Sequence, residues 1–335
     1  AIGALRDGGV MWGVPLAPKC MALFVNDALV KKTPVDLEGI AELKSTLPAG
    51  VFPLVYEAKN TYAHAAIFVA FGGELLTKDD QWGFFGPGAE ASLALARSLV
   101  VQGAVPEDAD YNLLKELFKA GKAAFVISGP WLQGELSGAT NLKYHVEVLP
   151  KIRAAGQPMR PMLTVESAML TKEGAAKPEA RALARWLGGR EAAEIRARVA
   201  GMLTARTDVA MPEDNAAMRA FAEQVKVAVP MPASRAMQTV WEPSNRAVIK
   251  VLSGDAPPDV ALAEAKRRFD MVRRPVPPPA SPTPYLVLVG AGLLGLVLYW
   301  LRGAKQGDFT AEVKKSLPAY KYVLHAVVAV GVLVI

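Results

Sequence analysis

The chain has 335 residues, enough for one large or two medium domains with a substantial core, and a net charge of +6 at pH 7. Its single cysteine excludes an internal disulfide framework, and its three scattered histidines exclude a histidine-rich metal site, so we expect neither metal nor cofactor. From Arg273 onward seven Lys/Arg stand against two acidic residues, so this segment carries 7 − 2 = +5 and the rest is nearly neutral. With no basic patch interleaved with aromatic residues, a nucleic-acid partner is not expected.

Residues 1–272 alternate strand-like and helix-like segments, which predicts an α/β domain with mostly parallel sheets. The expected strands are, in chain order, 10–18, 21–26, 51–57, 123–127, 146–150 and 167–172. The expected helices are 34–47, 61–71, 88–103, 111–122, 177–189 and a closing pair within 242–270.

The stretch FVISGPWLQGEL, residues 125–136, predicts a buried strand that turns abruptly into a helix. The apolar run 123–127 is typical of a strand covered on both faces, and Pro130 suits the first turn of a helix. Trp131 is then expected at the carboxyl end of a strand, the edge at which open α/β sheets bind ligands. Packing of this tryptophan in the core is the alternative.

The C-terminal segment has the pattern of a membrane-attached chain. Residues 273–284 form a proline-rich linker, and 285–301 form a charge-free run that would span about 25 Å as a helix, the short end for a bilayer. A basic loop, 302–322, precedes a second apolar run, 323–335, which we interpret as the start of another transmembrane helix. Since positive loops stay inside, the loop is expected in the cytoplasm, and residues 1–272 on the extracytoplasmic side of the inner (plasma) membrane.

Several stretches, in this order, resemble the extracytoplasmic solute-binding proteins of the family that includes maltose-binding protein. They are DGGVMWGVPLA, YNLLKELFKAGKAAFVISGPWLQGEL with NLKYHVEVLP, and VPMPASRAMQTVWEPSNRAVIKVLSGDAPPDVALAEAKRRFD. The resemblance covers residues 8–270.

It implies a two-lobed periplasmic-binding-protein (type II) fold over residues 1–272, followed by transmembrane helices. Residues 19–160 and 213–272 would form mainly the second lobe, and 1–13 and 165–212 the first. Because the chain opens with Ala rather than Met and the family's first quarter has no counterpart, we expect a fragment whose first lobe is incomplete.

The resemblance also implies ligand-binding roles for particular residues. Three are aromatic platforms and one is an apolar contact: Tyr62, Trp131, Trp241 and Met231. Three more replace polar groups of the maltose-binding member, namely Lys19 and Asn60 at carboxylates and Asn245 at an arginine. An aromatic ring buries the apolar C–H face of a pyranose while polar groups bond its hydroxyls, so these residues favour a sugar or oligosaccharide.

The expected function is capture of a sugar, maltose- or maltodextrin-like in class, and its delivery to a fused permease of an ABC importer. The partners would be an ABC ATPase subunit and a second permease subunit. A membrane-anchored receptor with a cytoplasmic output domain, or a simple tethered binding protein, are the alternatives. An enzyme is not expected, because the common nucleophile, nucleotide and zinc motifs are missing and nothing in the sequence sets two of Glu135, Glu166 and Glu242 across a cleft.

Overall fold

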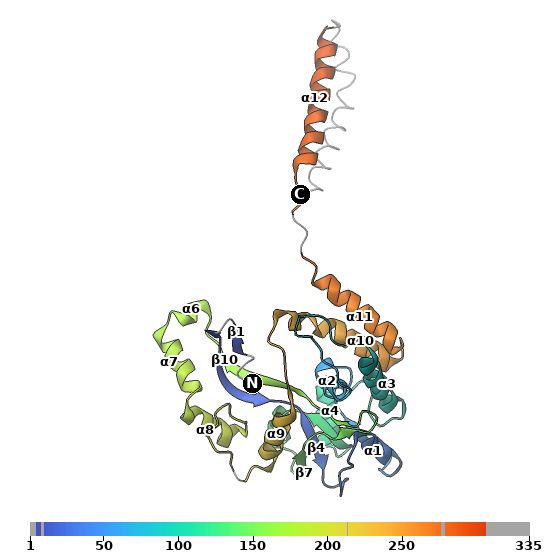
Figure 1. Cartoon of the computed structure of the whole chain (residues 1–335), viewed down its shortest axis with the longest axis vertical. Helices are drawn as coiled ribbons and strands as arrows, with labels where there is room; N and C mark the ends of the chain where they lie inside the picture. Colours follow the sequence, from blue (N-terminus) through green and yellow to red (C-terminus); the bar gives the residue numbers. More distant parts are fainter. Residues whose placement is uncertain (1–4, 8–9, 213, 276–278, 306–335) are drawn as a thin grey trace. The chain divides into compact units, whose positions relative to one another are not determined.

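A computed structural model describes residues 5–7, 10–212, 214–275 and 279–305. The chain separates into two compact units, Ala1–Arg274 and Pro275–Ile335. Every strand of the described residues belongs to the first unit, whereas the helix of the second is α12 (Thr283–Lys305) (Figure 1).

The main sheet has four strands in the order β5 (Phe52–Val55), β6 (Ala123–Ser128), β4 (Ala22–Asn26) and β7 (Tyr144–Glu147). Every residue of β4 and of β6 is buried, which confirms the prediction of a strand covered on both faces. Both strands are buried because helices pack against each face of the sheet.

Successive side chains of these strands point alternately into two hydrophobic cores, one on each face of the sheet. Leu23, Leu54 and Phe125 point into the larger one, and Phe24 and Val126 into the smaller one. The helices of the larger core are α1 (Leu37–Glu42), α2 (Thr61–Ala70), α3 (Pro87–Val101), α10 (Trp241–Ser253) and α11 (Pro258–Val272). Those of the smaller core are α4 (Tyr111–Lys119), α5 (Trp131–Leu136) and α9 (Ala216–Val227).

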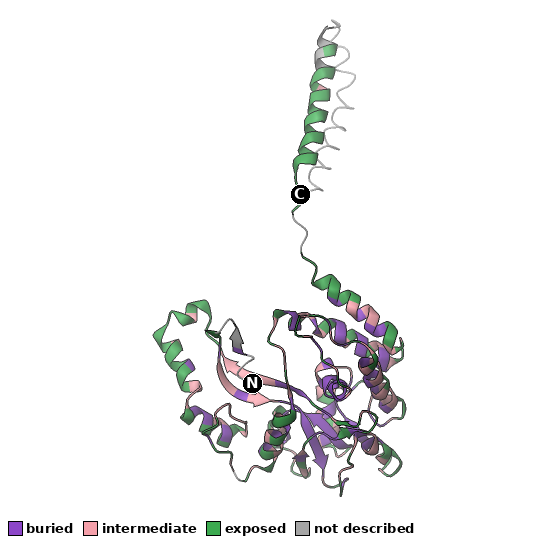
Figure 2. Ribbon diagram, in the orientation of Figure 1, coloured by how far each residue is buried: buried purple, intermediate pink, exposed green. Residues whose placement is uncertain are grey.

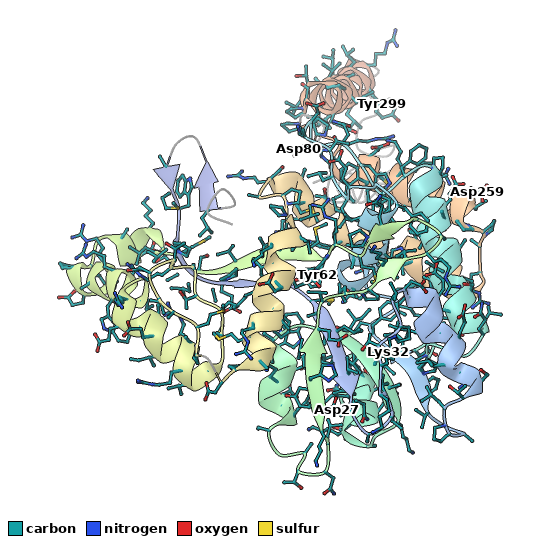
Figure 3. The ribbon with its side chains drawn as sticks, turned by 60° about the horizontal axis from the view of Figure 1, so that its bottom comes forward. Asp27, Lys32, Tyr62, Asp80, Asp259 and Tyr299 are labelled. Carbon is teal, nitrogen blue, oxygen red and sulfur yellow. The ribbon has the colours of Figure 1, made fainter. Side chains whose placement is uncertain are left out.

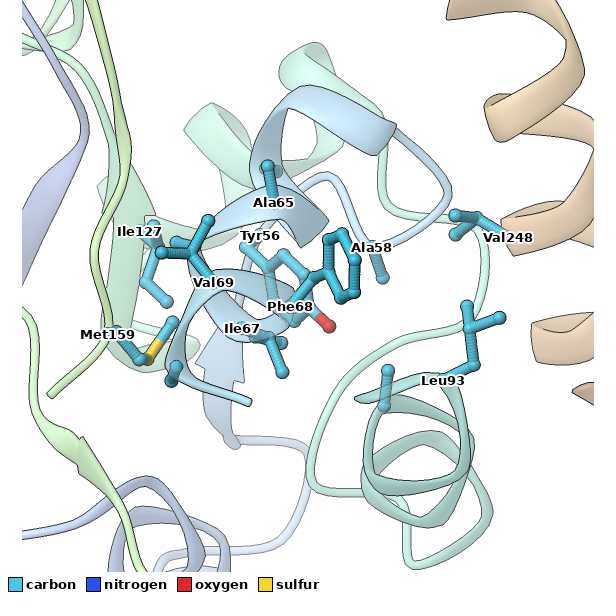
Figure 4. Close-up of a cluster of buried hydrophobic side chains, with 14 of the residues drawn as sticks. Tyr56, Ala58, Ala65, Ile67, Phe68, Val69, Leu93, Ile127, Met159 and Val248 are labelled. Carbon is cyan, nitrogen blue, oxygen red and sulfur yellow. The ribbon is translucent and has the colours of Figure 1, made fainter. Parts of the chain in front are cut away.

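Helix α2 lies at the centre of the larger core. Figure 4 shows its Ile67 and Phe68 beside Tyr56, with Leu93 of α3 and Val248 of α10 close by. All of α2 except Tyr62 is buried, so this helix is held on almost every side. Its position matters below because the start of α2 carries part of the candidate site.

A second sheet of three strands leaves the main body in the order β11 (Val229–Pro230), β10 (Met162–Ala168) and β3 (Val14–Lys19). Strand β10 pairs antiparallel with β3, with Thr164 opposite Lys19, and its ladder shifts between Glu166 and Ser167. These two strands run from the main body to a smaller group of elements (Figure 1).

The smaller group consists of the hairpin β1 (Arg6–Asp7) and β2 (Val10–Met11) and the helices α6 (Lys172–Ala175), α7 (Pro178–Leu187) and α8 (Arg190–Ala200). Large apolar side chains are exposed here, Trp12 by 62%, Leu183 by 56% and Val199 by 75%. Figure 2 shows the exposed outer surface of these helices against the buried main sheet.

The prediction of mostly parallel sheets was wrong. Pairing is parallel between β5 and β6 and between β10 and β11, whereas β4 with β6, β4 with β7 and β3 with β10 are antiparallel. Alternation of strands and helices predicts parallel pairing only where a helix returns the chain to the same edge. Strand β4 enters the main sheet from β3 of the other sheet and runs antiparallel to both of its neighbours, although helix α1 separates it from β5.

Other boundaries differ for local reasons. The strand expected at 167–172 is β10, which lies earlier and ends at Ala168. The helix expected from Pro34 begins at Leu37, because the Asp36 side chain caps it by accepting from the Gly39 N–H. Helices α8 and α9 were not predicted. The remaining hairpin pairs β8 (Lys151–Ile152) with β9 (Gln157–Pro158).

The first predicted membrane span, 285–301, lies within α12. Among the described residues no helix meets the length and apolarity required to cross a membrane, so this span is not confirmed. The second span, 323–335, lies outside the described residues.

Candidate ligand-binding site

Trp131, the first residue of α5, lies at the surface rather than in either core. Its side chain is 36% exposed. The indole ring covers the backbone at Gly129, where an added Cβ would come within 2.0 Å of ring atom Cζ3. The ring is therefore seated on a glycine at the end of β6, with part of its surface free.

Lys19 ends β3 beside this ring. Its Nζ lies 5.9 Å from the centroid of the Trp131 ring and 2.7 Å from Oε1 of Glu166 in β10. The lysine thus joins an aromatic face to a carboxylate from the neighbouring strand. The sequence analysis considered Glu166 only for a glycosidase pair, and the signal that it missed is the one charged residue of β10.

Tyr62 reaches the same pair of strands from α2. Its hydroxyl donates to the Met162 carbonyl over 3.5 Å. The side chain of Thr164, which lies opposite Lys19, is beside this hydroxyl. Burial raises the pKa of Tyr62 to about 12, so the phenol keeps its proton at neutral pH. Figure 3 labels Tyr62 near the middle of the first unit.

Trp241 and Met231 complete the apolar part. The Trp241 ring, at the start of α10, lies with its centroid 6.4 Å from that of Tyr62 at an interplanar angle of 59°. The Met231 N–H donates to the Leu163 carbonyl over 3.0 Å and so continues the β10–β11 ladder. Both side chains are half-buried against the larger core.

Neighbouring side chains therefore lead from Trp131 through Lys19 and Thr164 to Tyr62 and Trp241. The row has an aromatic ring at one end, two at the other and polar groups between them, an arrangement suited to a ligand with both apolar faces and hydroxyl edges.

The sequence of residues 2–223 matches the family described as bacterial extracellular solute-binding protein. The chain belongs to this family. The relatives of this solute-binding protein bind substrates and are not enzymes.

Individual relatives agree with the family. The galactooligosaccharide-binding protein of Bacillus subtilis is 28% identical over 76% of this chain, and the chain spans 64% of that relative's length. The maltose/maltodextrin-binding domain of Bdellovibrio bacteriovorus, bound to maltotriose, has a TM-score of 0.73 at 21% identity, covering 82% of this chain and 76% of its own. The Thermus thermophilus maltotriose-binding protein, bound to maltotriose, has a TM-score of 0.73 at 23% identity, covering 81% and 75%. At these identities the structures establish the fold, a mixed α/β fold of the maltose-binding, type II periplasmic class.

Two residues of the predicted site of this solute-binding protein hold α2 in place. The Asn60 side chain caps α2 by accepting from the Tyr62 N–H at 2.9 Å, and the Asn245 Oδ1 accepts from the Thr61 N–H at 2.8 Å. Their carbonyl oxygens are thus engaged in orienting the helix that carries Tyr62. Contact of these amides with a ligand stays a prediction.

One cavity of the described surface lies apart from this site. A surface cavity of about 600 Å³ is lined by Lys31, Lys32, His145 and Lys151 among others, and none of the seven predicted residues borders it. Within the described part of the chain no group of three or more His, Cys, Asp or Glu side chains is placed to hold a metal ion.

Proposed function

We propose that this solute-binding protein captures a sugar or oligosaccharide outside the membrane and delivers it to a fused ABC importer permease. The observation that carries the sugar part is the row of Trp131, Tyr62 and Trp241 with the Lys19–Glu166 pair inside it. Aromatic rings cover the C–H faces of pyranoses, and charged groups form strong hydrogen bonds with hydroxyls. The relatives named for galactooligosaccharides, or bound to maltotriose, support this ligand class.

Titration calorimetry of the full chain with maltotriose and with galactotriose tests the sugar part. We expect one of them to bind, and Trp131→Ala to weaken that binding by about 1–3 kcal/mol, as for other buried aromatic contacts. Trp186→Ala is the matched control, because Trp186 is a similarly exposed tryptophan (47%) on α7, outside the row. Loss of folding in Trp131→Ala, or equal effects of the two variants, would contradict the assignment.

Capture would use the type II fold as a two-lobed clamp. Residues 19–160 and 213–272 would form mainly the second lobe, and 1–13 and 165–212 the first, with β3 and β10 as the crossing strands between them. The site row follows these two strands, so a ligand there would sense the angle between the lobes.

Delivery is supported by the sequence after the domain. The proline-rich linker 273–284 and the charge-free run 285–301 precede the basic loop 302–322 and the apolar run 323–335. A tethered domain supplies its own channel at high effective concentration. A separate ATPase and a second permease subunit would complete the importer.

Sequencing the reading frame beyond Ile335 tests delivery. Four or more further hydrophobic spans, with a cytoplasmic loop able to dock an ATPase, are expected. A kinase-like or cyclase-like domain would make the protein a receptor, and a stop codon would make it a tethered binder; either result would overturn the transporter proposal and leave the sugar site unaffected.

A further inference from the structure

The Lys19–Glu166 pair is placed where it can meet a ligand. Its side chains come from neighbouring strands, β3 and β10, and remain 33% and 39% exposed. An ion pair this exposed contributes little to stability, typically about 0–1 kcal/mol. Stability alone therefore does not account for two charges beside an exposed tryptophan.

The local strand geometry directs Glu166 toward the site. Thr164 lies opposite Lys19, and Glu166, two residues further along β10, lies on the same face of the sheet as Thr164. The ladder shifts only after Glu166, where β3 carries the extra residue Leu16, so Thr164 and Glu166 both lie in the regular part of the pairing. Since the Thr164 side chain lies beside the Tyr62 hydroxyl and the Lys19 ammonium lies over the Trp131 ring, this face is the one that carries the aromatic row.

Both charged groups keep hydrogen-bonding capacity. A carboxylate offers about four acceptor positions and an ammonium three donors, and the 2.7 Å contact uses one of each. Within the described part of the chain, the charged ends of Lys19 and Glu166 make no other hydrogen bond. The pair therefore presents free acceptors and donors side by side, with the ammonium over the Trp131 ring.

We infer that Glu166 contacts the ligand and that, paired with Lys19, it selects neutral polyhydroxylated ligands over acidic ones. The inference rests on the proposed sugar-binding function and adds a residue and a ligand class to it. Hydroxyl groups donate to the carboxylate and accept from the ammonium. An acidic sugar is disfavoured because Glu166 repels its carboxylate and already occupies Lys19.

The test compares neutral and acidic trisaccharides by titration calorimetry of the full chain, using maltotriose, galactotriose and trigalacturonate. The unchanged protein should bind a neutral trisaccharide and not trigalacturonate. Glu166→Gln should weaken neutral binding about tenfold, the effect of losing one charge-assisted hydrogen bond, and should create binding of trigalacturonate, because Lys19 is then unpaired. Raising the salt concentration should abolish this new binding.

Two further variants separate the pair from general effects. Lys19→Met removes the cation, so the affinity for the neutral trisaccharide should fall and trigalacturonate should still not bind. If Glu166→Gln does not fold, this variant tests the role of the pair in its place. Glu264→Gln is the matched control, because Glu264 pairs with Lys250 at 2.5 Å with similar exposure, 45% and 36%, on α11 and α10. It should change neither binding.

The outcomes distinguish the two proposals. If Glu166→Gln and Lys19→Met change the affinity for the neutral trisaccharide by no more than about twofold, the role of the pair is overturned and the sugar function is kept. A twofold change is smaller than the tenfold effect expected from one charged hydrogen bond. Tight binding of trigalacturonate by the unchanged protein would overturn the selection of neutral ligands. Binding of none of the three would overturn the proposed function itself.

Discussion

The indole ring of Trp131 lies directly on Gly129, two residues earlier in the chain. A Cβ added at residue 129 would be 2.0 Å from ring atom Cζ3 and 2.2 Å from Cη2, far inside the contact distance of two carbons. The orientation of the exposed ring therefore depends on the absence of a side chain at the end of β6. This relationship makes Gly129 a positioning residue for the candidate site.

Gly129→Ala is expected to displace the Trp131 ring and to weaken trisaccharide binding about as much as Trp131→Ala does. Titration calorimetry with the trisaccharide that binds the unchanged protein measures the loss. Gly134→Ala is the control, because Gly134 also lies in α5 and a Cβ there meets nothing within 4 Å. Unchanged binding in Gly129→Ala would show that the ring position seen here does not matter to the ligand.

Asn245 is predicted to matter for stability even without a ligand. Its Oδ1 accepts from the Thr61 N–H, and Thr61 is fully buried, so Asn245→Ala leaves this donor unsatisfied at a cost of about 1–3 kcal/mol. Asn245→Asp retains the acceptor at a helix N-terminus and should retain most of the stability. Urea unfolding of the ligand-free protein measures both, and an undiminished free energy of unfolding in Asn245→Ala would contradict the structural role.

The sequence could predict the elements that depend on local patterns. The apolar run before Ser128 and the Pro130 turn indicated both the buried strand β6 and the exposed start of α5. The wrong prediction of mostly parallel sheets concerned pairing, which depends on how the chain enters the sheet. Strand β4 is antiparallel to β6 although helix α1 lies between β4 and β5, so the alternation of strands and helices does not indicate its direction.

In the candidate site, too, some features could be predicted from the sequence and others depend on how the strands pair. The family resemblance predicted site roles for Tyr62 and Trp241. The structure places the centroids of their rings 6.4 Å apart, although the two residues are far apart in sequence. The partner of Lys19 was missed, because the link to Glu166 depends on the register of β10 against β3. Asn60 was named for a ligand role, although an asparagine immediately before the helix expected from residue 61 is also the sequence signal of an N-cap, the role that the structure shows.

His64 is expected to make the fold acid-sensitive. This histidine of α2 is fully buried with Nε2 3.0 Å from the Ser92 hydroxyl oxygen, and burial lowers its pKa from 6.5 to about 3. As the pH falls from 6.5 to 3, the His64 imidazole becomes protonated in the unfolded chain but stays neutral in the folded protein. The free energy of unfolding therefore falls by up to about 1.4 kcal/mol per pH unit from this group.

Urea unfolding of His64→Gln and of the unchanged protein at pH 7, 6, 5 and 4 isolates this contribution. The variant should be less stable at pH 7 but should lose less of its stability as the pH falls, because it has no imidazole to protonate when unfolded. Carboxylates contribute equally to both proteins and cancel in the comparison. Parallel pH curves for the two proteins would show that His64 does not resist protonation.

His145 should act with the opposite sign. Its Nδ1 lies 2.6 Å from Oδ1 of Asp27 and its Nε2 3.0 Å from Oε1 of Glu147. Partial burial lowers the pKa of His145, but the hydrogen bonds to Glu147 and Asp27 outweigh it and raise the pKa above 6.5. A raised folded pKa gives stability that is fully present below pH 6.5 and is lost as the pH rises through the folded value.

Since the His145 side chain is 44% exposed, solvent screening keeps this contribution to stability below about 1 kcal/mol. His145→Gln should therefore destabilise the protein at pH 5.5 more than at pH 8.5 in low salt, measured by urea unfolding, and an equal loss at both pH values would contradict the pairing with the two carboxylates.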